Sequence, residues 1–221
     1  MYSAIKTEIL RYLGYSGQKI SPEITSLIDE TIKEVSMFTP LHTYAVSDVV
    51  FEENAVFLRD IDIVLHGTDI QNHLKGAVKC ITFACTLGAV FDAELMRKQP
   101  QSMTKAVIFD SAGTAFIEAA ADRTESDILK PYHDAGLFSK FRYSPGYGDL
   151  PITLQQDITK ALDCPRKIGL TVTENNILIP RKSITAFIGI FDTPQEKPRS
   201  KCMACQMRDS CKMRKDGFSC D

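Results

Sequence analysis

The stretch Arg142-Tyr143-Ser144-Pro145-Gly146-Tyr147-Gly148-Asp149-Leu150-Pro151 combines an arginine with two tyrosines, two glycines and two prolines. The prolines fix φ locally, whereas the glycines permit tight turns and the close approach of another molecule. Such a backbone can present N–H and C=O groups beside the planar guanidinium of Arg142, whose fork suits a carboxylate or a phosphate. From composition alone, a surface turn with Arg142 as a hydrated charge is the commoner interpretation.

The bulk composition is that of an ordinary globular protein. The chain has 221 residues, of which 44% are hydrophobic and 24% charged, and its net charge is −2. It is long enough for one large domain, or one domain with an appendage, and a sizeable core. The charge gives no sign of a nucleic-acid or membrane surface. Neither a secretory signal nor an apolar run long enough to span a bilayer is recognisable, so we expect a cytoplasmic protein.

Apolar spacing predicts helices along much of the chain. A short amphipathic helix is expected over 4–13, before two glycines. Ser21-Pro22-Glu23 is a helix start, with a hydroxyl N-cap, a first-turn proline and an acid, and that helix continues toward Pro40. Further helices are expected over 68–74, 90–97, 102–129 and 154–162.

Strands are expected between these helices, over 44–51, 55–58, 62–64 and 78–85. The last of these is continuously apolar, which indicates burial on both faces and makes Cys80 and Cys85 core residues on opposite faces. A closing hairpin is predicted from 177–179 and 183–190, with 180–182 at its turn. Because strands and helices do not alternate strictly, the expected class is α+β, with a mixed, mainly antiparallel sheet and flanking helices.

The C-terminal end differs in composition from the rest. We expect a domain over 1–191, a polar linker with two prolines over 192–200, and a Cys-rich tail over 201–221. The tail has few apolar side chains, so four thiolates around a metal would supply the free energy that its burial cannot. Zinc and an iron–sulfur cluster are both compatible with the spacing, and a reduced, flexible tail is the remaining alternative. The candidate metal ligands are Cys202, Cys205, Cys211 and Cys220.

The pattern Arg-x-x-Pro-Gly-Tyr-x-x-x-Pro in 142–151 resembles the signature of the activation domain of cobalamin-dependent methionine synthase, the module that binds S-adenosylmethionine. Other blocks follow in the same order. The stretch 77–88 resembles the strand and turn before that domain's long helix, 105–118 resembles the helix, and 170–174 and 179–183 resemble its closing strands. The similarity covers about half of the chain, and the whole resembles a free-standing short form of the domain.

The resemblance implies a role for each matching residue. Arg142 would hold the methionine carboxylate of S-adenosylmethionine, and the backbone of Ser144 would hydrogen-bond the ligand beside it. Pro145 and Gly146 would shape the loop, and Tyr147 would face the corrin. Glu174 and Ser183 would have supporting roles. Asp110 and Glu118 share one helix face, where a carboxylate could meet the sulfonium, although a solvated face is the simpler interpretation.

The resemblance also implies partners. No cobalamin-binding Asp-x-His-x-x-Gly motif is present, so the cobalamin would belong to a separate corrinoid methionine synthase polypeptide. A flavodoxin- or ferredoxin-type protein would donate the electron, and the family's redox task favours an iron–sulfur tail. Two ligand-binding residues of the full-length synthases, an early acid and a late tyrosine, have no placeable counterpart here.

Two other functions stay open. The chain could be a metal-binding electron-transfer or docking protein for another corrinoid methyltransferase, with the tail as its active part. It could also be a free-standing methyltransferase, although the glycine-rich βαβ loop of the common Rossmann-type enzymes is missing.

Overall fold

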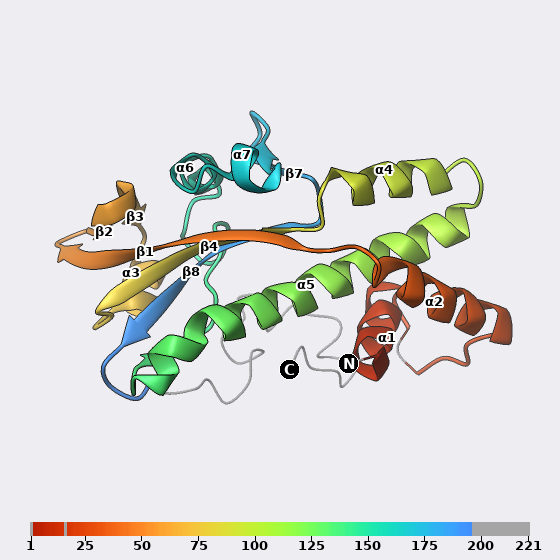
Figure 1. Ribbon diagram of the computed structural model, residues 1–221, viewed down its shortest axis with the longest axis horizontal. Helices are drawn as coiled ribbons and strands as arrows, with labels where there is room; N and C mark the ends of the chain where they lie inside the picture. Colours follow the sequence, from red (N-terminus) through yellow and green to blue (C-terminus); the bar gives the residue numbers. More distant parts are fainter. Residues whose placement is uncertain (1, 16, 196–221) are drawn as a thin grey trace.

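A computed structural model describes residues 2–15 and 17–195 of the chain (Figure 1). The predicted Cys-rich tail therefore lies outside the described residues. The helices are α1 Tyr2–Tyr12, α2 Pro22–Val35, α3 Thr68–Leu74, α4 Ala89–Lys98, α5 Met103–Asp134, α6 Leu154–Ala161 and α7 Cys164–Ile168, with a short 3-10 helix at Arg59–Ile61. The strands are β1 Leu41–Glu52, β2 Ala55–Leu58, β3 Ile63–His66, β4 Lys79–Thr86, β5 Phe138–Ser139, β6 Thr171–Val172, β7 Leu178–Ile179 and β8 Ser183–Phe191.

The expected α+β class with an antiparallel sheet is confirmed. Six strands form one sheet in the order β3-β2-β1-β4-β8-β5. Each neighbouring pair is antiparallel, and β4 pairs with β8 along its whole length, from Lys79 opposite Ile190 to Thr86 opposite Ser183. Strand β4 therefore lies inside the sheet, between β1 and β8.

Helices cover the two faces of the sheet separately, with α5 on one side and α6 and α7 on the other (Figure 1). Side chains alternate accordingly along β8, where Ile188 packs in the α5 core and Phe187 in the α6–α7 core. Strand β4 is buried on both faces, with Cys85 in the first core and Cys80 in the second. The continuous apolar run predicted this two-sided burial correctly.

Helix α5 is the longest element and runs diagonally under the sheet (Figure 1). The Ser102 hydroxyl accepts the backbone N–H of Lys105 and so caps its first turn. At Gly113, an added Cβ would lie 2.1 Å from the Phe91 ring, so the missing side chain lets α4 pack closely. The helix continues past the predicted end at 129 to Asp134, because Pro131 removes one backbone donor without stopping the last turn.

The predicted closing hairpin is wrong. Strand β7 pairs with β6 in a separate two-stranded sheet, whereas β8 lies between β4 and β5. Strand β8 pairs with β4 from its first residue, Ser183, while β7 pairs with β6, so β7 and β8 do not pair with each other. Cys164 begins α7 and is fully buried in the α6–α7 core.

Candidate functional site

The 142–151 stretch begins along the β8 edge of the main sheet, where its successive side chains point to opposite faces of the sheet. Tyr143 exchanges two backbone hydrogen bonds with Phe187, each 2.9 Å long, which extends the pairing at the β8 edge beyond β5. The Tyr143 ring belongs to the α6–α7 core. Because neighbouring side chains of extended backbone point to opposite faces, Arg142 points toward α5.

The turn that follows is closed by its own backbone. The N–H of Tyr147 donates to the carbonyl of Ser144 at 3.0 Å, and the N–H of Gly146 donates to Leu150 at 2.8 Å. The Tyr147 ring packs edge-on against Tyr143 with centroids 5.8 Å apart, yet 55% of Tyr147 is exposed. The turn thus presents an aromatic side chain on a constrained backbone.

Two aspartates, Asp69 and Asp149, fix the far end of the loop to α3, because each carboxylate accepts backbone N–H groups from the other segment. The Asp149 carboxylate accepts the N–H groups of Thr68 and Asp69, at 2.6 and 3.1 Å, and so caps a helix that has glycine at its N-cap. Asp69 accepts the N–H of Asp149 at 3.3 Å in return. Burial and then these two carboxylates raise the pKa of Tyr143 to about 12, so its hydroxyl stays protonated beside them.

Arg142 is held against α5 by three carboxylates. Its Nη1 lies 2.6 Å from Glu125, and its Nη2 lies 2.8 Å from Asp122 and 3.3 Å from Glu118. These acids are four and three residues apart, so they share one side of the helix. Burial lowers the pKa of Arg142, but the attraction of Glu125 and Asp122 outweighs it and raises the pKa overall. The guanidinium is therefore permanently charged.

A second ion pair lies on the same side of α5, closer to the N-terminus of the helix. Lys182, just before β8, lies 2.8 Å from the Asp110 carboxylate and donates to the Thr114 hydroxyl at 2.8 Å. Asp110 and Glu118, for which a solvated face was the simpler expectation, are thus both ion-paired. We call the row formed by Asp110, Glu118, Asp122 and Glu125 the α5 acidic face.

The structure brings together part of the predicted set. Arg142, Ser144, Pro145, Gly146 and Tyr147 lie in one loop, from which Arg142 reaches α5 while Tyr147 packs against Tyr143. Ser183 lies apart from this loop, and its hydroxyl is 2.7 Å from the Thr86 hydroxyl and 2.6 Å from the Pro180 carbonyl oxygen. Those contacts give Ser183 a position at the junction of β4 and β8.

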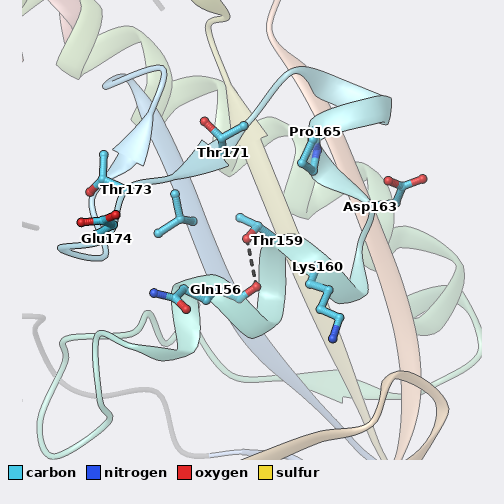
Figure 2. Close-up of a pocket in the computed structure, with 9 residues that line it drawn as sticks. Gln156, Thr159, Lys160, Asp163, Pro165, Thr171, Thr173 and Glu174 are labelled. Carbon is cyan, nitrogen blue, oxygen red and sulfur yellow. Dashed lines mark hydrogen bonds between the residues drawn. The ribbon is translucent and has the colours of Figure 1, made fainter.

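Glu174 is not brought together with Arg142. It lines a cavity of about 560 Å³ among α6, α7 and β6, on the side of the sheet opposite α5 (Figures 1 and 2). The threonine hydroxyls of this cavity are engaged, since Thr159 donates to the carbonyls of Gln155 and Gln156, and Thr171 to that of Ile179. The cavity is lined by Gln156, Thr159, Lys160, Asp163, Pro165, Thr171, Val172, Thr173 and Glu174.

Within residues 2–15 and 17–195, no group of three or more His, Cys, Asp and Glu side chains is arranged to hold a metal ion. The predicted ligands Cys202, Cys205, Cys211 and Cys220 lie beyond that part of the chain. In the same part, no helix is both long and apolar enough to cross a membrane.

Among solved structures, the chain is similar to the crystal structure of the MetH reactivation domain bound to AdoHcy. The TM-score is 0.66 at 15% identity, and the match covers 99% of this chain and 83% of that chain. The chain has the reactivation-domain fold. The resemblance predicted from the 142–151 signature is thereby confirmed in the fold. No protein-family model and no curated protein matches the sequence.

The sequence alone did not reveal three residues that hold Arg142 and its loop in place. Asp122 and Glu125 lie in a long helix with many charged residues, so their composition did not single them out. Their spacing of four and seven residues from Glu118 does place all three on one helix face. Asp149 belongs to the 142–151 signature, but the neighbouring sequence does not indicate that it caps a helix about eighty residues earlier.

Proposed function

We propose that this protein is an accessory subunit that reactivates a cobalamin-dependent methionine synthase in trans, by binding S-adenosylmethionine and presenting its methyl group to the corrinoid of a separate polypeptide. The observation that supports this most is the position of Arg142. Its guanidinium lies against the α5 acidic face and is 14% exposed, and the aromatic, glycine-rich loop follows it directly in the chain. That arrangement places one fixed cation beside several carboxylates at the surface.

The charges of this site fit the amino-acid end of S-adenosylmethionine. Its carboxylate is a partner for the guanidinium fork of Arg142. Its ammonium and sulfonium are cations, for which Glu118 and Asp122 on the α5 acidic face offer exposed carboxylates. Ser144 would approach the ligand through its backbone, and Gly146, which has no side chain, would permit that close approach.

Among the residues that the structure describes, none offers a reactive thiol at this site. The three described cysteines are buried, and burial raises the pKa of Cys80 to about 12 and that of Cys85 and Cys164 to about 11. The contribution of the protein would therefore be positioning. The sulfonium would supply the methyl group, and cobalt on the partner, reduced by a flavodoxin- or ferredoxin-type donor, would accept it as the S–CH₃ bond breaks.

Tyr147 would serve the docking step. It is exposed on a turn whose backbone is closed by hydrogen bonds, and its ring is braced by Tyr143. A flat, rigid side chain at this position suits contact with the planar face of a corrin.

A methyl-transfer assay tests the proposal. The corrinoid methionine synthase polypeptide in its cob(II)alamin form would be incubated with a chemical one-electron reductant and methyl-labelled S-adenosylmethionine, with and without this protein. We expect rapid labelling of the corrinoid only when the protein is present, and loss of most of that acceleration with Arg142→Ala. Equal labelling with and without the protein would contradict the proposal.

A further inference from the structure

The ion pairs of Arg142 are asymmetric. On the Nη1 side, Glu125 is 2.6 Å away and its side chain is only 18% exposed. On the Nη2 side, Asp122 is 2.8 Å away and 68% exposed, and Glu118 is 3.3 Å away and 51% exposed. The guanidinium therefore has one protected edge, bound to a nearly buried acid, and one edge whose partners are hydrated.

The hydrated edge is where we expect a carboxylate arriving from solvent to meet Arg142. There the nearer position on Nη2 is already occupied by Asp122. Because a guanidinium presents a fixed fork of N–H donors, an incoming carboxylate must take donors that Asp122 and Glu118 now use. The Asp122 carboxylate is 68% exposed although Arg142 is only 14% exposed, so water screens the pair from the Asp122 side. At the magnitude of a surface ion pair, about two- to five-fold in an equilibrium, the pair can be displaced.

We infer that Asp122 is a specificity-determining residue, whose carboxylate competes with the α-carboxylate of a nucleoside sulfonium amino acid for Nη2 of Arg142. The inference rests on the proposed function and adds a competitor to its site. Glu125 is the positioning residue that keeps the guanidinium on α5 during the exchange. Asp122 thereby lowers the preference of the site for ligands that carry a carboxylate.

Two ligands that differ in this carboxylate isolate the effect. S-adenosylmethionine and decarboxylated S-adenosylmethionine share the adenosine, the sulfonium and the ammonium, so the ratio of their Kd values reports the carboxylate alone. Calorimetric titrations of the full-length protein would compare wild type, Asp122→Asn, Arg142→Ala and the double variant. Asp127→Asn is the matched control, because Asp127 is exposed on α5 two residues beyond Glu125, and so on the opposite side of the helix.

We expect Asp122→Asn to raise the preference for the carboxylated ligand about two- to five-fold over wild type, and Asp127→Asn to leave it unchanged. In the Arg142→Ala background, Asp122→Asn should have no effect on the ratio. If Arg142→Ala loses the preference for the carboxylated ligand while Asp122→Asn leaves it unchanged or reduces it, Asp122 does not compete for Arg142. Arg142 would then still bind the ligand carboxylate. If neither wild type nor Asp122→Asn binds S-adenosylmethionine, both the competition and the proposed function fail.

Discussion

A Cβ atom added at Gly148 would lie 2.2 Å from Oδ2 of Asp69, the carboxylate that accepts the N–H of Asp149. The second glycine of the signature is thus required by packing as well as by its positive φ of 55°. Because Asp69 and Asp149 fix the loop to α3 while Arg142 fixes it to α5, the loop is held from both sides of the sheet.

Gly148→Ala should therefore destabilise the protein more than an alanine at an equally strained but open glycine. Gly136 is the matched control, since its φ is +80° and nothing lies within 4 Å of an added Cβ. Urea unfolding should give Gly148→Ala an additional loss of about 1–3 kcal/mol, the usual cost of overpacking. If both variants lose the same free energy of unfolding, the loop accommodates the added methyl group at Gly148 without measurable destabilisation.

Stability should depend on the protonation of His73. This buried ring lies 3.0 Å from the Phe141 carbonyl oxygen, and burial, followed by the Lys140 ammonium, lowers its pKa from 6.5 to about 4. In the unfolded chain, His73 therefore binds a proton below pH 6.5, whereas in the folded chain it binds one only near pH 4. Stability is full above pH 6.5 and falls by about 3 kcal/mol toward pH 4.

The measurement is the free energy of unfolding at pH 8 and pH 5, for wild type and His73→Gln. The glutamine retains a donor for the Phe141 carbonyl but cannot titrate. We expect a smaller difference between the two pH values in the variant. An undiminished difference would assign the acid sensitivity to other groups.

Tyr147 should affect docking rather than ligand binding. Tyr147→Ala should leave the Kd of S-adenosylmethionine near the wild-type value and slow methyl transfer to the corrinoid partner, because the ring is exposed on the loop surface. Tyr147→Phe, which keeps the flat ring, should restore most of the rate. A loss of ligand binding by Tyr147→Ala in the free protein would place the ring in the nucleotide site instead.

The tail should bind one metal centre without being needed for the fold. Strand β8 ends at Phe191, inside a core formed by earlier residues. A protein truncated after Phe191 should remain folded and bind S-adenosylmethionine, but lose the metal that we predict at Cys202, Cys205, Cys211 and Cys220. Metal analysis after anaerobic purification and thermal melts of both proteins check this. An intact protein without metal would contradict the prediction.

Most strands and helices, and the α+β class, could be predicted because local rules decide them. The Ser21-Pro22 start of α2 and the apolar run of β4 each have one dominant interpretation, and the structure contains both. The predicted hairpin failed because β7 and β8 are adjacent in sequence, yet β7 pairs with β6, and β8 pairs with β4 and β5. Strand pairing depends on which edges are free, which local sequence does not encode.

The candidate site was predicted in part for a similar reason. Arg142 and Tyr147 lie in a motif with recognisable spacing, whereas the acids that bind Arg142 come from a helix distant in sequence. Glu174 matched a strand position, but the sheet separates it from α5 (Figure 1). Only the three-dimensional fold shows which matched positions share a face.

Calorimetric titration of S-adenosylmethionine into wild type, Arg142→Ala and Arg142→Lys tests the central claim most directly. Removing a hydrogen-bonded charge partner should weaken binding by about 1.5–3 kcal/mol in the alanine variant. Lysine should restore only part of the affinity, because a point charge lacks the fork of the guanidinium. Arg97→Ala, at a surface arginine that is 71% exposed, should bind like wild type. Equal affinities for wild type and a folded Arg142→Ala protein would contradict the account and remove Arg142 from the ligand site.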